Sequence, residues 1–404
     1  MMLAALSELW LYTQHIVRAC QQDPGLAVGM MQQGCRPKMS DTDPGQLLPA
    51  HQIIEKGVSR RPRLLVVQPL VGIGDMVWHK PWIDHLAREY DIILATKPTV
   101  HAQHLFACTP HIADILLIER SLRGKRGRHD GISGLLRLAT DIRSVKADKA
   151  LILHHSARYG FASWLAGIAQ RWGYGIGGSA RWLNAGRFLD RAARTQHPTA
   201  KMAEFATLNG FSPPQTNWTI AATASACDAA DTFIVEAGVG KTEHMLILGV
   251  GAMHVDRQWP PTHFARLIEK ISARFPHLHF GLMGANAELP LIEAVIAQLS
   301  DASRVIICTR PLDQSIALLE RALLYVGNDT SLLNIAAACG RPAIGLFAQT
   351  LPLIYNPKIK SVAVSSDQVG KPGAIKTIAP DLVFDAVCTE LHHHGVVPAQ
   401  VAAR

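Results

Sequence analysis

Short apolar runs alternate with segments of helical periodicity along most of this chain. In the first half the runs are RLLVVQ, DIILAT, ADILLI and KALILHH, and in the second half they are HMLILGVGA, LHFGLMG, RVIICT, LLYVGND and PAIGLFAQT. The first of them, RLLVVQ, is a short apolar run flanked by turn signals, which is typical of a strand buried on both faces. Strands of this kind separated by helices form parallel sheets, so the sequence predicts an α/β fold.

The alternating pattern occurs in two series, separated by the looser segment NGFSPPQTNWTIAATASACDAAD. A chain of 404 residues is long enough for two domains of ordinary size. We predict two Rossmann-like domains, over residues 60–215 and 240–390, that face each other across a central cleft. Residues 1–59, rich in Gly, Pro and Gln without periodicity, are expected to be a loose extension, and residues 391–404 a tail.

Several broad classes of protein do not fit the composition. The seven cysteines are dispersed singly, which favours a reducing compartment and excludes the common zinc spacings. No run of about 18 uncharged apolar residues is present, and the N-terminus has no basic lead, so we expect a cytoplasmic protein. The consecutive histidines His392–His394 cannot all face one ion from a regular element, and no metal site is predicted.

Positive charge is concentrated in the first half of the chain. Residues 60–204 contain 22 Lys or Arg against 11 Asp or Glu, although the net charge of the whole chain is +8. The stretch RSLRGKRGRHDG contributes Arg123, Lys125, Arg126 and Arg128. Such a loop suits an anionic substrate or membrane face, and a solvated basic surface is the alternative.

A glycine turn follows the first strand, in the sequence VVQPLVGIGDMVWHKPW, where Gly72 and Gly74 precede Asp75. A dinucleotide site requires G-x-G-x-x-G and an acidic residue at the end of the next strand. Val77 stands in place of the third glycine, and the next strand ends in Thr96 and Lys97. The turn is therefore not predicted to bind a dinucleotide.

Asp75 has two interpretations. An acidic residue at a helix N-terminus caps free N–H groups and complements the helix dipole. Alternatively, Asp75 is a general base projected from the turn, and hydrogen bonds from helix N–H groups hold it ionised.

A second glycine turn occurs in GVGAMHVDRQWPPTHFARLIEK, where a strand, a turn and a helix that begins with proline follow one another. This arrangement lines a site with backbone N–H donors around Gly251 and Ala252. Arg257 is predicted to bind a diphosphate there, with a surface arginine as the alternative. Trp259 is expected to be a packing residue.

The third site is predicted in YVGNDTSLLNIAAACGRPAIGLF, where Asp329, Thr330 and Ser331 stand between a strand and a helix, with Asn334 one turn further on. Hydroxyl and N–H groups here suit phosphate oxygens, although helix capping alone would explain Asp329 and Thr330. The second and third sites fall in one domain and Asp75 in the other. An anion-binding half that faces a carboxylate is the layout of group transfer from a nucleotide sugar.

The ordered set of motifs resembles glycosyltransferase family 9, the bacterial lipopolysaccharide heptosyltransferases of GT-B fold, over roughly residues 62–390. The motifs that carry the resemblance are VVQPLVGIGDMVWHKP, RWGYG, HPTAKMAEFATLNG, GAMHVDRQWP and NDTSLLNIAAACGRPAIGLFAQT. The resemblance implies that Asp75 is the catalytic base and that Arg257 replaces a diphosphate-binding lysine. It also implies that Asp329 and Thr330 contact the donor.

The sequence departs from the family pattern at three positions. Asn334 replaces the usual histidine, Ser331 replaces a glycine, and Met253 follows Gly251 and Ala252 where a small polar residue is common. Donor binding is nevertheless assigned to Gly251, Ala252, Arg257, Asp329, Thr330, Ser331 and Asn334. Acceptor binding is assigned to Gly72, Gly74, Arg123, Lys125, Arg126 and Arg128.

Taken together, the residues and the resemblance predict an inverting glycosyltransferase with Asp75 as general base. The expected co-substrate is a nucleotide diphospho-sugar, with ADP-heptose as the expected donor, and no metal or coenzyme is expected to be bound by the protein. The expected acceptor is a phosphorylated glycolipid or polysaccharide of the cell envelope, and no nucleic acid is expected to bind. The inner face of the inner membrane is a second predicted location. The alternatives are a nucleotide-sugar epimerase of similar fold and a non-catalytic member that only binds the donor.

Overall fold

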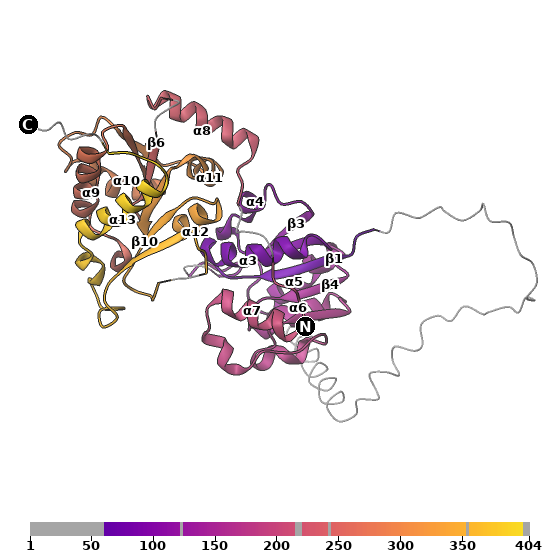
Figure 1. Cartoon of the computed structure of the whole chain (residues 1–404). Helices are drawn as coiled ribbons and strands as arrows, with labels where there is room; N and C mark the ends of the chain where they lie inside the picture. The colour runs from indigo at the N-terminus through magenta and orange to yellow at the C-terminus, as the bar shows by residue number, and fades with distance from the viewer. Residues whose placement is uncertain (1–59, 122–123, 215–219, 241–243, 353–354, 399–404) are drawn as a thin grey trace, which may run out of the picture. The chain divides into compact units, whose positions relative to one another are not determined.

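In the computed structural model, the described residues are 60–121, 124–214, 220–240, 244–352 and 355–398. The predicted N-terminal extension, Arg123 and the last six residues lie outside these ranges. The described part of the chain forms two parallel sheets, the first in the indigo-to-magenta half of the ribbon and the second towards its yellow end (Figure 1).

The first sheet has five strands in the order β3-β2-β1-β4-β5. The strands are β1 (Arg63–Gln68), β2 (Asp91–Thr96), β3 (Ile112–Leu117), β4 (Lys149–Ile152) and β5 (Gln170–Gly173). The helices in this half are α3 (Ile73–Leu86), α4 (Ala102–Leu105), α5 (Gly131–Ser144), α6 (Ala157–Leu165) and α7 (Pro198–Leu208). All four strand pairings are parallel, as the apolar runs predicted.

The second sheet has six strands in the order β11-β10-β9-β6-β7-β8, all parallel. The strands are β6 (His244–Gly249), β7 (Leu278–Met283), β8 (Val305–Cys308), β9 (Leu324–Asn328), β10 (Ala343–Phe347) and β11 (Ile359–Ala363). The helices are α8 (Ala224–Glu236), α9 (Pro261–Arg274), α10 (Leu289–Ile296), α11 (Leu312–Arg321), α12 (Ser331–Ala338) and α13 (Pro380–His393). The predicted α/β class with two parallel sheets is confirmed.

Three elements differ from the sequence expectations. The segment RWGYGIGG, interpreted as a turn, overlaps strand β5, which is only four residues long and has polar residues in its first half. Helix α8 begins inside the segment interpreted as a loose boundary and extends beyond it. Its buried residues are the small alanines Ala226 and Ala230. Helix α13 extends to His393 and buries Leu391, so regular structure continues beyond residue 390.

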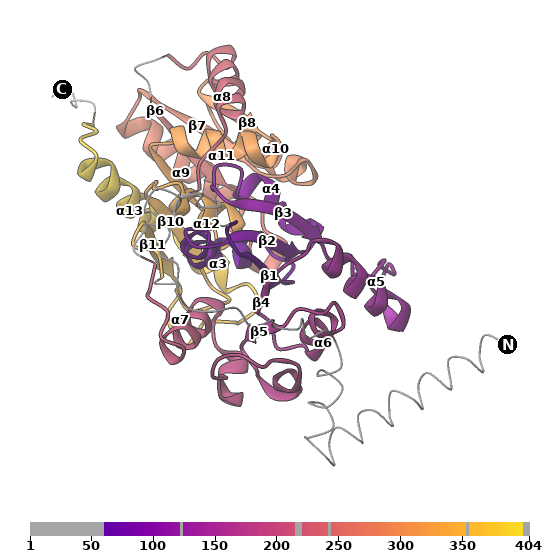
Figure 2. The same ribbon diagram turned by 90° about the vertical axis from the view of Figure 1, so that its right-hand side faces the viewer.

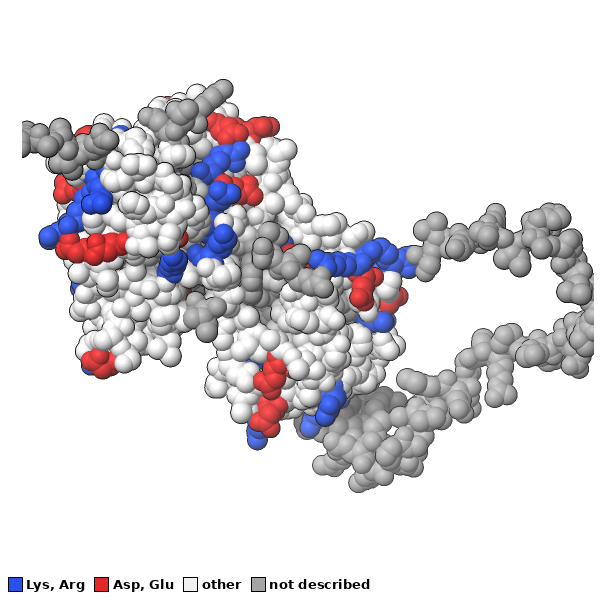
Figure 3. Space-filling view, viewed as in Figure 1, with Lys and Arg blue, Asp and Glu red and all other residues white. Residues whose placement is uncertain are grey.

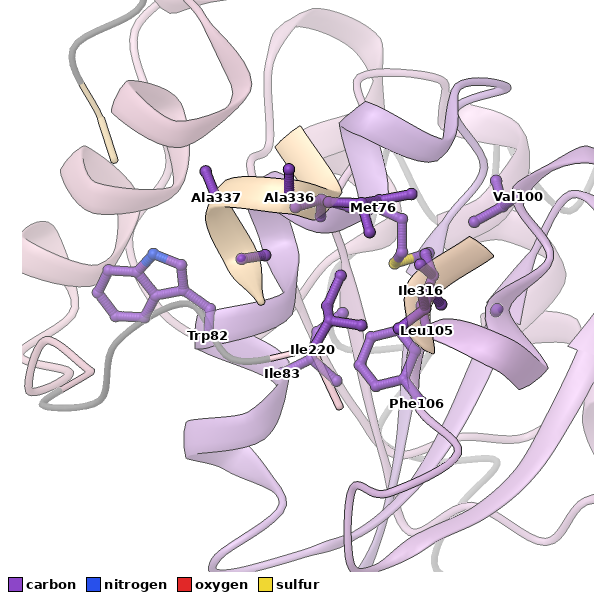
Figure 4. Packing of buried hydrophobic residues seen from close by; sticks show 14 of the residues in the cluster. Met76, Trp82, Ile83, Val100, Leu105, Phe106, Ile220, Ile316, Ala336 and Ala337 are labelled. Carbon is purple, nitrogen blue, oxygen red and sulfur yellow. The ribbon is translucent and has the colours of Figure 1, made fainter. Parts of the chain in front are cut away.

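The two halves share an apolar core between α3 and α12, which lie side by side in both views (Figures 1 and 2). Met76 and Ile83 of α3 are fully buried in one cluster with Ala336 and Ala337 of α12 and Ile316 of α11 (Figure 4). Small residues on α12 allow the two helices to approach closely. Apolar burial stabilises by about 25 cal/mol per Å², and separating α3 from α12 would expose this core. The core therefore holds the glycine turn at the start of α3 in a defined position relative to the start of α12.

Candidate active site

The three sites predicted from the sequence all follow strands at the carboxyl edges of the two sheets. Gly72 and Asp75 follow β1, which lies between β2 and β4, where the strand order of the first sheet reverses. Gly251 follows β6 and Asp329 follows β9, and these two strands pair directly, with Gly249 opposite Gly327. In open parallel sheets, ligands bind at such reversals of strand order.

Asp75 lies in the first turn of α3 and caps the helix. Its Oδ2 accepts a hydrogen bond from the backbone N–H of Gly72 at 3.2 Å. A side chain at Gly72 would meet this carboxylate at 2.8 Å, so glycine leaves the room that the carboxylate occupies. The capping interpretation therefore describes a contact that is present, and it does not compete with a catalytic role for the other carboxylate oxygen.

The electrostatic environment of Asp75 differs from the expectation that helix N–H groups hold it ionised. Burial raises the pKa of this carboxyl above its ordinary value, and the hydrogen bond from Gly72 only partly offsets that effect. One backbone N–H bond is too little to balance the loss of solvation. A carboxylate with a raised pKa binds a proton more tightly and is a stronger base.

His79 supports the same turn from one helical turn further on. Its ring is buried and contacts the backbone carbonyl of Asp75 through Nδ1 at 2.7 Å. A carbonyl only accepts, so Nδ1 carries the proton and Nε2 accepts from the Tyr174 hydroxyl at 3.2 Å. Burial lowers the pKa of His79 to about 4, so the imidazole is neutral at physiological pH.

Arg257 and Asp329, which the sequence placed in separate motifs, meet in the structure. Arg257 Nη1 lies 3.4 Å from Asp329 Oδ2, which also accepts a hydrogen bond from the Thr350 hydroxyl at 3.2 Å. Burial raises the pKa of Asp329, while Arg257 and Thr350 act in the opposite direction. The guanidinium is about one-third exposed and the carboxylate is largely covered, so the arginine presents the accessible charge.

Asn328 joins the second and third motifs, a role that the sequence analysis did not assign. Its Nδ2 donates to the carbonyls of Val250 and Gly251, and its Oδ1 accepts from the backbone N–H of Trp259. Trp259 is fully buried, as expected for a packing residue, and its indole N–H donates to the carbonyl of Ile378. The loop that carries Arg257 is thereby held at both ends against the end of β9.

The remaining predicted donor residues surround the start of α12. Thr330 is the N-cap of the helix, but its side chain makes no capping hydrogen bond, and Ser331 begins the first turn. Gly251 is buried against the carboxylate of Glu288, which leaves no space for a side chain, and Ala252 is buried beside it. The N-terminus of an α-helix with uncapped N–H groups suits an anion.

Asn334 contacts the first half of the molecule directly. Its Oδ1 accepts a hydrogen bond from the indole N–H of Trp78 at 3.1 Å, and its Nδ2 donates to the carbonyl of Thr330 at 2.9 Å. The Trp78 ring packs against His197 at 4.3 Å and against Tyr355 at 5.6 Å between ring centroids. Donor binding by Asn334 stays a prediction, because the protein itself engages its oxygen and one N–H.

A group of basic side chains at the carboxyl edge of the first sheet was not identified as a site from the sequence. We call it the basic cluster; it consists of Lys97 after β2, Arg120 after β3, His154 and His155 after β4, and Lys201 on α7. Lys97 Nζ donates to the carbonyl of Arg120 at 3.1 Å, and the two histidine rings stack at 4.4 Å. The polar residues that follow β2, β3 and β4 were the sequence signal that could have identified this site.

The members of the basic cluster affect one another electrostatically. The pKa of His154 falls to about 3, first because of burial and then because of His155, Lys201, Arg120 and Lys97. Burial, and then Arg120, also lower the pKa of Lys97. Mutual repulsion between basic groups of this kind is relieved when an anion binds among them.

The predicted cationic loop is partly neutralised by the protein. Arg128 donates two hydrogen bonds of 2.7 Å to Asp141, and Arg120 lies 3.4 Å from Asp130. Arg126 and Arg128 line an open cavity of about 420 Å³, and Lys125 is exposed. On the face drawn in Figure 3, blue groups occur in short rows, and red groups lie directly beside several of them.

Two features are absent from the described residues. No helix there is both long enough and apolar enough to cross a membrane. No three side chains of His, Cys, Asp or Glu come together there in the manner of a metal site. His393 instead approaches Glu390 of the same helix at 3.5 Å.

Comparison with known proteins agrees with this geometry. The sequence model of glycosyltransferase family 9 (heptosyltransferase) matches residues 135–376. A search of curated proteins finds no match. A glycosyl transferase family 9 structure from Veillonella parvula is 19% identical, with 82% of this chain and 97% of that chain covered and a TM-score of 0.68.

Two structures from E. coli are similar in the same way. The ADP-heptose lps heptosyltransferase II is 18% identical over 82% of this chain and 99% of its own, with a TM-score of 0.65. The heptosyltransferase WaaC with ADP-2-deoxy-2-fluoro heptose is 17% identical over 81% and 99%, with a TM-score of 0.58. At these identities the likeness establishes the fold.

The two parallel-sheet α/β domains match the GT-B fold of these glycosyltransferase structures. The family match extends over more than half of the chain. The chain belongs to glycosyltransferase family 9.

Proposed function

We propose that this protein transfers heptose, with inversion at the anomeric carbon, from ADP-heptose to a hydroxyl of a lipopolysaccharide core. The observation that carries the proposal is the packing of α3 against α12, which brings the turn bearing Asp75 beside the helix that begins after Asp329 and Thr330. The family description and the names of the two E. coli structures support heptose as the sugar and ADP-heptose as the donor.

In the proposed reaction, Asp75 removes the proton from the acceptor hydroxyl as the oxygen attacks the anomeric carbon. The bond between that carbon and the diphosphate oxygen breaks, and ADP leaves with the electron pair. Attack from the face opposite the leaving group inverts the configuration. The raised pKa of Asp75 makes its carboxylate a stronger base for this step.

The donor diphosphate is assigned to Arg257 and to the N–H groups at the start of α12. Arg257 supplies an accessible positive charge, and its pairing with Asp329 orients it. Asp329 is assigned to sugar hydroxyls, because a carboxylate accepts hydrogen bonds from hydroxyls but repels phosphate. Positive charge around the departing diphosphate stabilises the leaving group, the work that a metal ion performs in other enzymes.

The acceptor is assigned to the first half of the molecule. Its phosphate or carboxylate groups are assigned to the basic cluster, and the loop with Lys125, Arg126 and Arg128 is assigned to more distant anionic groups. The chemistry of both groups of residues favours a phosphorylated glycolipid at the inner face of a membrane. The location of the protein in the cytoplasm is part of this proposal.

The test is an assay of the purified full chain with ADP-heptose and a lipopolysaccharide that lacks heptose. We expect ADP release that depends on the acceptor, a mass increase of the acceptor by one heptose, and an inverted anomeric linkage by NMR. Release of nucleotide or an epimerised sugar without acceptor would contradict the proposal in favour of an epimerase. Binding of ADP-heptose without turnover on any envelope acceptor would instead indicate a non-catalytic member.

A further inference from the structure

Asn334 and Trp78 form a hydrogen bond that joins the second turn of α3 to the first turn of α12. The amide of Asn334 is buried, with 3% of its surface exposed. A side chain built on Gly74 would lie 3.4 Å from Asn334 Nδ2, so the amide also touches the turn immediately before Asp75. The bond therefore connects the segment that carries the proposed base to the segment that carries the proposed donor site.

Aromatic rings hold the indole in place. His197, at the start of α7, packs on Trp78 from the first half of the molecule, and Tyr355 approaches it from the second half. The rings of His197 and Tyr355 also stack on each other, with 5.5 Å between their centroids. Trp78 has little freedom to rotate away, so the direction of its N–H bond is fixed by packing.

We propose that Trp78 and Asn334 are a positioning pair, whose hydrogen bond sets the distance between Asp75 and a donor bound at the start of α12. This inference rests on the proposed function. Asp75 is three residues before Trp78 on one helix, and Thr330 is four residues before Asn334 at the start of the other. A shift of one helix along the other would move the base relative to the anomeric carbon, and a misplacement of about 1 Å costs roughly 100-fold in rate.

The pair also accounts for the departure from the family pattern at position 334. An indole N–H only donates, so its partner must accept. The oxygen of a neutral amide accepts at every pH, whereas a protonated imidazole has only donors. Asparagine therefore satisfies Trp78 and the carbonyl of Thr330 together at every pH, whereas an imidazole can do so only when it is neutral.

The experiment removes the bond from each side separately and then from both. Trp78→Phe keeps an aromatic ring between His197 and Tyr355 but has no N–H, and Asn334→Ala removes the acceptor. We expect kcat for transfer from ADP-heptose to fall about 3- to 10-fold in each, the range of a single hydrogen bond. The double variant should fall no further than either single variant, because the same bond is lost.

Two further measurements distinguish positioning from other roles. Affinity for ADP, measured by calorimetry, should stay within about two-fold of wild type in all three variants. The matched control is Trp82→Phe, the same substitution four residues along α3 in the apolar core. It should lower the melting temperature without lowering kcat of the folded enzyme.

A third variant adds a pH signature. In Asn334→His the introduced imidazole can accept from Trp78 only when neutral, so kcat relative to wild type should fall below about pH 6.5. The extra pH dependence should vanish when Trp78→Phe is added. Titratable groups that surround the pair are common to both proteins and cancel in this ratio; they are Asp75, His79, His197, Lys201, Asp329 and Tyr355.

The outcomes separate this inference from the proposed function. A wild-type protein that transfers no sugar overturns the proposed function, and the positioning pair with it. A wild-type protein that transfers sugar, together with full kcat in Trp78→Phe and Asn334→Ala, overturns the positioning pair alone. Weaker ADP binding in Asn334→Ala but not in Trp78→Phe would also overturn it, because Asn334 would then be a donor ligand.

Discussion

The carboxyl edges of the two sheets present different kinds of chemical groups to a ligand. The edge of the second sheet uses glycines, backbone N–H groups and one arginine already paired with a carboxylate, Arg257 with Asp329. The edge of the first sheet gathers Lys97, His154 and Lys201, and there burial, followed by neighbouring basic groups, lowers the pKa of Lys97 and of His154. The second edge is nearly neutral and sterically defined, whereas the first is cationic and electrostatically strained.

This difference matches the two ligands of a transferase. A nucleotide diphosphate is small and of constant shape, so backbone donors and close packing can recognise it. A glycolipid acceptor is large and offers its anionic groups at the end of an extended molecule, so long basic side chains are better suited to it. Asp75 belongs to the cationic edge, although its neighbours in space include the start of α12.

The largest effect is expected at Asp75. Asp75→Asn keeps the cap on Gly72 but cannot take a proton, and loss of a general base costs about 10²- to 10⁴-fold in rate. ADP affinity should be unchanged. In wild type the rate should fall as the pH falls through the raised pKa of Asp75, because only the ionised form is a base.

Stability supplies the control for Asp75. A buried carboxyl with a raised pKa destabilises the folded state when it is ionised. At a pH above that pKa, Asp75→Asn should therefore have a melting temperature equal to or higher than that of wild type. Asp75→Ala removes the cap as well and should lose about 0.5–2 kcal/mol. Transfer at near wild-type rate by Asp75→Asn would end the catalytic interpretation.

His79 tests whether the first edge is the acid-sensitive one. Its pKa in the folded state is about 4 and in the unfolded state about 6.5, so the unfolded chain binds the extra proton first as pH falls. Its contribution is complete above pH 6.5 and is lost between pH 6.5 and 4, by about 3 kcal/mol at most. Urea unfolding measured between pH 6.5 and 4 should show this loss of stability in wild type but not in His79→Gln. The same pH dependence of the free energy of unfolding in both proteins would contradict this prediction.

Arg257 tests the second edge. Arg257→Ala removes a charge-assisted contact with phosphate, typically about 1.5–3 kcal/mol, so ADP should bind roughly 10- to 150-fold more weakly. Arg257→Lys should recover much of the affinity, since charge is the main requirement. Calorimetry with ADP measures both. Unchanged affinity in the alanine variant would make Arg257 a surface arginine paired with Asp329.

The smallest effect is expected in the basic cluster, and it sharpens the comparison between the edges. Lys97→Met with Lys201→Met should raise the KM for acceptor by roughly two- to five-fold for each charge and weaken its dependence on salt. The matched control is Arg126→Ser with Arg128→Ser, which should change KM less, because Arg128 is already paired with Asp141. ADP affinity should be unchanged in both double variants. A loss of ADP affinity together with the rise in KM for acceptor would mean that the donor binds at the edge of the first sheet, contrary to this assignment.

Much of the fold was predictable because burial leaves a local pattern. Apolar runs such as RLLVVQ and HMLILG are strands buried on both faces, and their alternation with helices leads to parallel sheets. Strand β5 and helix α8 were not predicted from the sequence. The strand is short and begins with polar residues, and the buried residues of the helix are small alanines, so both give weak hydrophobic periodicity. The boundaries of the two domains stay predictions.

The sequence by itself also determined which residue types stand at the strand ends, including Asp75, Arg257, Asp329 and Thr330. Only the tertiary structure decided which of them meet. Arg257 reaches Asp329 because β6 pairs with β9, and Trp78 reaches Asn334 across 256 positions of sequence because α3 packs on α12. Local periodicity encodes how much of a segment is buried, but pairing between distant segments, and the burial that raises the pKa of Asp75, depend on the packing of the whole chain.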